Sequence, residues 1–157
     1  MDSYLILKLI HIISATVLAG TGIGIAFFML MASRSGNPQA VAVTARNVVL
    51  ADWIFTTPAI AIQFVTGIWL MKLLHYPFTS TWFIVVISLF VFIGCCWVPV
   101  VFIQYRLKNI VEGQERDDVL DARFRRLMAL WTALGIPAFL GIAIMFWLMV
   151  FKPLGVI

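Results

Sequence analysis

Four long stretches without a charged side chain constrain this chain more than any other feature of its sequence. The first has 22 uncharged residues between His11 and Arg34, and the last has 25 between Arg126 and Lys152. About 20 apolar residues in a helix are enough to cross the hydrocarbon core of a bilayer. The sequence therefore predicts four membrane spans, which we place at Tyr4–Ala32, Leu50–Leu74, Thr81–Tyr105 and Leu127–Phe151.

The composition supports a membrane protein rather than a soluble one. Hydrophobic residues make up 63% of the 157 residues and charged residues 11%, whereas soluble domains average roughly 45–50% and about 25%. We expect a single domain, residues 1–157, that folds as an all-α transmembrane antiparallel four-helix bundle in the lipid bilayer. Prolines at positions 58, 99 and 137 fall in three different spans and predict kinked helices.

The basic residues predict the orientation of the bundle. The net charge of +4 does not indicate a nucleic-acid partner, because these residues gather in the loops between spans. Three basic residues, Lys8, Lys72 and Lys152, lie on the side of the termini. The positive-inside rule predicts cytoplasmic loops and periplasmic termini. Eight basic residues lie in the two opposite loops: Arg34, Arg46, Arg106, Lys108, Arg116, Arg123, Arg125 and Arg126.

Local signals extend the second helix beyond the membrane. Asn37 followed by Pro38 is typical of a helix cap and first turn, so we expect this helix to begin in the cytoplasm. The mixed charges of 112–126 indicate a solvated turn before the fourth helix.

His11 is the strongest candidate for a functional side chain. It lies about 10 Å inside the outer end of the first span, and the small residues Ala15 and Gly22 share its face. One interpretation is a neutral histidine that hydrogen-bonds to a neighbouring helix. The other is a metal or haem ligand through a ring nitrogen. Lys8, one turn further out, either reaches the membrane surface or pairs with an anionic group such as a haem propionate.

A polar stripe runs along the second span. Its residues share one helical face, and lipid cannot accept such a face, so the stripe should point toward protein. Hydrogen bonds between helices are one explanation, and a pocket for a polar ligand or a proton path is another. Asp52 could also be a solvated acid at the membrane border. The stripe consists of Asp52, Thr56, Gln63, Thr66 and Gly67.

Other residues have weaker signals. Met71 and Met145 lie toward the outer ends of their spans and are candidates for an axial ligand at the depth of His11. Gly20 and Gly24 form a GxxxG pattern that permits self-association, so a homo-oligomer is one possible assembly. The chain contains neither a glycine-rich phosphate loop nor an HExxH motif. Two histidines exclude a site built from several histidines.

Two segments resemble known membrane families. The opening LKLIHIISATVLAG (7–20) is similar to the first helix of HemJ-type protoporphyrinogen oxidases, and RFRRLMALWTALGIPAFLGIAIMFWLMVFKP (123–153) is similar to their ending. Over nearly its whole length the chain resembles an uncharacterised bacterial family of four-helix membrane proteins, a domain of unknown function. The resemblance implies a bacterial inner membrane and a haem b ligand at His11. The HemJ-type histidine and lysine of the third helix are missing from 81–85, so the oxidase activity is not implied.

Three functions remain open, and whether the protein is an enzyme is left undecided. The first is a haem b protein that transfers electrons, with a quinone or porphyrin as partner. The second is a membrane subunit or scaffold without cofactor. The third is a small transporter in which the stripe from Asp52 to Gln63 lines a path.

Overall fold

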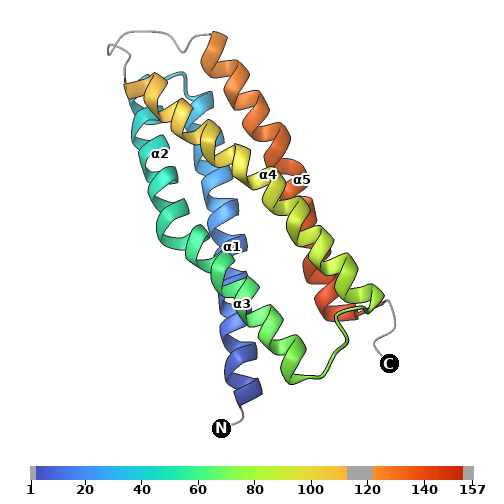
Figure 1. Ribbon diagram of the computed structural model, residues 1–157. Coiled ribbons are helices and arrows are strands. Elements are labelled where there is room, and N and C mark those ends of the chain that lie inside the picture. Colours follow the sequence, from blue (N-terminus) through green and yellow to red (C-terminus); the bar gives the residue numbers. More distant parts are fainter. Residues whose placement is uncertain (1–2, 113–121, 154–157) are drawn as a thin grey trace.

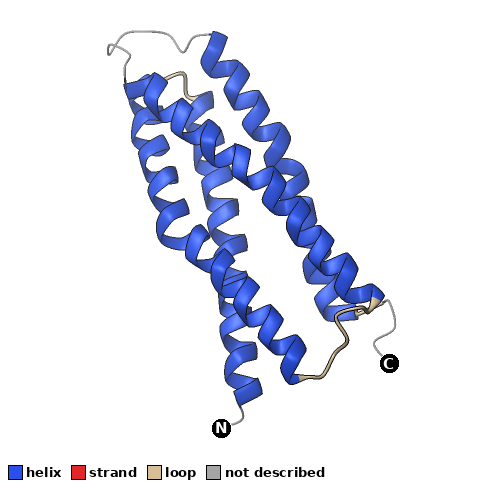
Figure 2. Ribbon diagram, viewed as in Figure 1, coloured by secondary structure: helices blue, strands red, loops and turns tan. Residues whose placement is uncertain are grey.

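The computed structural model describes residues 3–112 and 122–153, and its regular elements there are all helical (Figures 1 and 2). Four helices of 30 to 36 residues are long and apolar enough to cross a membrane, and they run antiparallel. This confirms the predicted all-α four-helix architecture. The elements in chain order are α1 (Ser3–Arg34), α2 (Pro38–Ala51), the π-helical η1 (Asp52–Thr56), α3 (Thr57–Leu73), α4 (Thr81–Glu112) and α5 (Ala122–Phe151).

The second membrane helix begins where the sequence predicted. The side-chain oxygen of Asn37 accepts hydrogen bonds from the backbone N–H groups of Gln39 (2.9 Å) and Ala40 (3.3 Å). Pro38 occupies the first turn, where its missing N–H costs nothing. From Pro38 the chain stays helical through α2, η1 and α3 as far as Leu73.

The π-helical turn lies directly before Pro58. In η1 the backbone N–H of Thr57 bonds to the carbonyl of Asp52, a wider turn than the α-helix makes. Proline has no N–H to donate to the preceding turn, and its ring crowds that turn. The predicted distortion at Pro58 therefore takes the form of a π turn, and Asp52 stands at its first position.

The end of α3 has an unusual residue in a common motif. Tyr76 N–H bonds to the Met71 carbonyl and His75 N–H to the Lys72 carbonyl, which together make a Schellman motif. His75 holds the left-handed position with a φ of 54°, a place that glycine usually takes. The chain then turns toward α4.

The buried core lies at one end of the bundle. It is built from the last part of α1, the first part of α2, the last part of α4 and the first part of α5, where α1 connects to α2. This is the end predicted to face the cytoplasm. All four helices contribute to it, with the residues Ile25, Met29, Ala32, Val41, Ala45, Val48, Val100, Leu107, Val111, Phe124, Met128 and Trp131.

At the opposite end the helices lie in two pairs. Toward the termini, α3 turns away from α4, while α1 stays on α3 and α5 stays on α4 (Figure 1). Trp82 Nε1 donates to the Leu148 carbonyl (3.0 Å) and ties α4 to α5. An aromatic contact between Phe64 and Phe90, with ring centroids 5.9 Å apart, joins α3 to α4. The half of the bundle on the side of the termini, which is the predicted outer half, is therefore an α1/α3 pair beside an α4/α5 pair.

Candidate functional site

His11 and Thr66 form the hydrogen bond between α1 and α3. The His11 Nδ1 and Thr66 Oγ1 atoms lie 2.7 Å apart. The Thr66 hydroxyl has one proton, and it donates this proton to the Ile62 carbonyl at 2.6 Å. Thr66 Oγ1 must then accept from His11, so Nδ1 has the ring proton and Nε2 has the free lone pair.

Gly67 lies against the imidazole. A Cβ atom at this position would lie 3.4 Å from His11 Cε1, an ordinary van der Waals contact. The polar stripe and the His11 face therefore meet at Thr66 and Gly67. The contacts of His11 with Thr66 and Gly67 were not predicted, because the sequence shows which residues share a face of each helix but not how α1 is rotated against α3.

The other residues proposed around His11 are more scattered. Lys8 is exposed, and its Nζ lies 5.6 Å from the centre of the Tyr4 ring. Met71 is buried, but it lies four residues beyond Gly67 on α3, about 6 Å further along the helix. Met145 is half-buried on α5. Their assignment as ligands stays a prediction.

The polar stripe points toward protein, as predicted. Asp52, Thr56 and Thr66 are buried and Gln63 is half-buried. Only 5% of Asp52 is exposed, so the interpretation of Asp52 as a solvated acid at the membrane border is wrong. Asp52 belongs to η1, which packs against α1, and Trp97 and Gln104 of α4 lie beside it.

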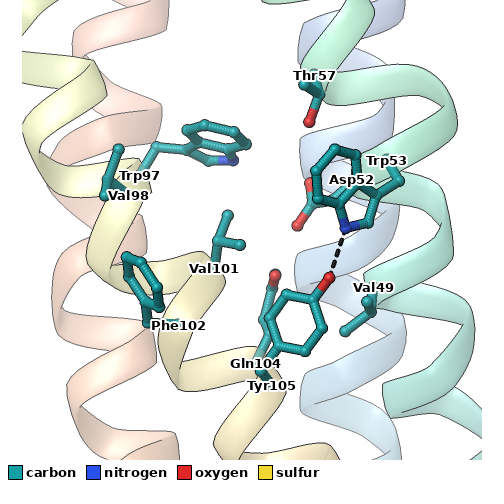
Figure 3. A pocket seen from close by; sticks show the side chains of 10 residues that line it. All are labelled: Val49, Asp52, Trp53, Thr57, Trp97, Val98, Val101, Phe102, Gln104 and Tyr105. Carbon is teal, nitrogen blue, oxygen red and sulfur yellow. Dashed lines mark hydrogen bonds between the residues drawn. The ribbon is translucent and has the colours of Figure 1, made fainter.

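A cavity of about 200 Å³ lies beside Asp52, between η1 and α4 (Figure 3). Polar atoms of Asp52, Thr57 and Gln104 point toward it from both sides, among larger aromatic side chains. Trp53 Nε1 donates a hydrogen bond to the Tyr105 hydroxyl across one edge. The lining residues are Val49, Asp52, Trp53, Thr57, Trp97, Val98, Val101, Phe102, Gln104 and Tyr105.

Several buried oxygen atoms in this region lack a hydrogen-bond partner. They include Asp52 Oδ2 and Gln104 Oε1, which belong to side chains that line the cavity, and Thr56 Oγ1 and Gln63 Oε1 on the same membrane helix as Asp52. Buried polar groups in proteins are nearly always paired with protein or water. A group of unpaired acceptors beside a cavity indicates a place for a ligand that donates hydrogen bonds or has a positive charge.

Gln104 and Trp97 were not singled out from the sequence. Gln104 is 3% exposed, and it is the only amide side chain in the span predicted at 81–105. A buried amide in an apolar helix needs a partner, and this signal could have identified it. Among the described residues, no group of three or more histidine, cysteine or acidic side chains could hold a metal ion.

Comparison with known proteins identifies a family that covers most of the chain. A family model described as "Predicted integral membrane protein (DUF2269)" matches residues 5–153. No curated protein and no solved structure matches the chain. The match confirms the expected membrane family, while the resemblance to HemJ-type oxidases rests on the two sequence segments.

Proposed function

Because the chain belongs to the DUF2269 family of predicted integral membrane proteins, we propose a function that one histidine inside a membrane bundle can perform. This function is the binding of haem b, with His11 as an axial ligand. When bound, haem supplies one-electron chemistry. A quinone or porphyrin is the electron-transfer partner that we propose.

The observation that supports this proposal is the hydrogen bond between His11 and Thr66. Histidines that bind metal usually donate their other ring N–H to an oxygen, which holds the ring in place and sets the tautomer. Thr66 does this for Nδ1, since its own proton goes to Ile62. His11 Nε2 is left with the lone pair that iron requires.

The outer half of the bundle is where such a cofactor would be held. His11 belongs to the α1/α3 pair, with its ring against α3, and the half-buried Met145 belongs to the α4/α5 pair. Met145 is therefore the preferred second ligand, and Met71 is the alternative on α3. Lys8 would pair with a propionate, since it lies one turn outward from His11. An iron with His11 as its only protein ligand is also compatible with these residues.

A scaffold without cofactor is the alternative, and the same hydrogen bond favours it. A bond between two membrane helices stabilises their packing whether or not anything binds Nε2. The two functions differ in what they require of Nε2. The scaffold needs only Nδ1, while the haem protein needs both ring nitrogens.

The visible spectrum of the protein, expressed with ample haem, tests the proposal. We expect a Soret band in the wild type that disappears in His11→Ala. His75→Ala is the matched control, because His75 is exposed in the turn after α3, and it should keep the band. A colourless wild type, or a Soret band unchanged in His11→Ala, would overturn the proposal.

Thr66 provides the finer test. Thr66→Val keeps the shape and removes the acceptor, and loss of such a partner typically weakens metal binding about 10–100-fold. Thr66→Ser keeps the hydroxyl and should retain affinity. Haem titration of the apoprotein measures both. Equal affinities in the two variants would show that the Thr66 hydroxyl does not orient His11.

A further inference from the structure

The Asp52 carboxyl group is buried without a charged partner. Arg46, the basic residue nearest to Asp52 in sequence, pairs with Glu112 at 2.6 Å. Arg106 and Lys108, which follow Gln104 on α4, form no ion pair with Asp52. Removing a carboxylate from water is costly unless a positive charge or several hydrogen bonds compensate. The side chains of Thr56, Gln104 and Trp97 lie beside the carboxyl group, but no partner lies within hydrogen-bond distance of Oδ2.

The walls of the cavity are rich in aromatic side chains. Trp53 lies on the wall of η1, and Trp97, Phe102 and Tyr105 lie on the wall of α4 (Figure 3). The faces of aromatic rings attract cations, tryptophan most strongly. A carboxylate together with aromatic faces provides what an organic ammonium group requires.

The cavity opens toward lipid near the inner border of the membrane. Trp53, Val98 and Phe102 line it, and about half or more of each side chain is exposed: 59%, 47% and 65%. Twenty residues of helix counted inward from Leu73 reach Trp53, about 30 Å, which is the thickness of the hydrocarbon core. Trp53 and Tyr105 also have the side chains that favour this interface.

We propose that this cavity, which we call the Asp52 cavity, binds an organic ammonium ion with an apolar body that enters from the inner leaflet. The charge would meet Asp52, the Gln104 carbonyl oxygen and the ring of Trp53, and the body would contact Phe102. An anion would be repelled, and a hydrocarbon chain would leave the buried acceptors unpaired. A small metal ion would find a single carboxylate here. This site lies apart from His11 and does not depend on haem binding.

Binding of phenethylammonium, which has N–H donors for the buried acceptors, tests the proposal. Its neutral isostere, propylbenzene, has nearly the same shape with carbon in place of nitrogen. Equilibrium dialysis of the radiolabelled cation against the protein in dodecyl maltoside avoids lipids that themselves have ammonium groups. We expect saturable binding, and a preference for the cation over the isostere of at least about tenfold, or 1.4 kcal/mol.

Asp52→Asn keeps the size of the side chain and removes the charge, and it should abolish this preference. Glu112→Gln is the matched control, because it removes a carboxylate outside the cavity, and it should bind like the wild type. Trp53→Leu should weaken binding of the cation more than binding of the isostere. If Asp52→Asn fails to fold, the comparison of cation and isostere on the wild type still decides.

Three outcomes would overturn the proposal. They are equal affinity for cation and isostere, unchanged cation binding in Asp52→Asn, and displacement of the cation by sodium ions at similar concentration. Displacement by phosphatidylethanolamine would support it and would identify a lipid headgroup as the source of the ammonium ion. Without such displacement, saturable binding of the free cation supports a soluble amine.

Discussion

Replacement of Gly141 by alanine tests the close contact between α4 and α5. A Cβ at this position would lie 2.8 Å from Ile93 Cγ1 and 3.2 Å from Ile93 Cδ1, with Leu89 Cδ1 at 3.5 Å. Cγ1 is near the backbone of α4, so moving the far end of the Ile93 side chain does not relieve this contact. The two helices must therefore separate. Overpacking of this kind costs about 1–3 kcal/mol.

The helix itself gains from the same substitution. Alanine stabilises a helix interior over glycine by up to about 1 kcal/mol, so with that gain subtracted the net loss for Gly141→Ala should be about 0–2 kcal/mol. Gly135→Ala is the matched control on the same helix, because nothing lies within 4 Å of its added methyl group. It should be neutral or stabilising.

Unfolding of both variants in mixed micelles with increasing SDS, followed by far-UV circular dichroism, measures these free energies. The wild type and the two variants share one helix and one detergent, so the difference between Gly135→Ala and Gly141→Ala isolates the contact with Ile93. If the two variants are equally stable, α5 does not approach α4 at Gly141. The pairing of α4 with α5 in the outer half would then be refuted.

Three further predictions concern the ends of the bundle. In a background without native cysteines, Thr79→Cys should react with an impermeant maleimide in intact cells, and Gln39→Cys only after lysis; the reverse pattern would contradict the orientation. His75→Gly should stabilise the protein by about 1 kcal/mol, because His75 holds a positive φ, and a loss of thermal stability would contradict this. Glu112→Gln should change the unfolding free energy by less than about 1 kcal/mol, since its partner Arg46 is well exposed; a larger loss would contradict the weak pair.

The sequence by itself determined the number of spans, the helical class and the start of the second helix. These features depend on local properties: the length of uncharged stretches, the chemistry of the Asn37 cap and the rigid ring of Pro38. The inward orientation of the stripe from Asp52 to Thr66 also followed from helical periodicity, because lipid excludes a polar face. The orientation of the bundle stays a prediction, and one of its eight loop residues, Arg116, lies outside the described residues.

Only the tertiary structure decided which faces meet. The rotation and register of one helix against another depend on side-chain packing summed over both. For this reason neither helix alone could show that His11 contacts Thr66 and Gly67 on α3 rather than residues nearer to Met71. The burial of Asp52 depends on the π turn and on α4, which supplies Gln104 and Trp97 from some 50 residues away. Local patterns place a polar residue on a face, and long-range packing decides whether that face is covered, paired or left beside a cavity.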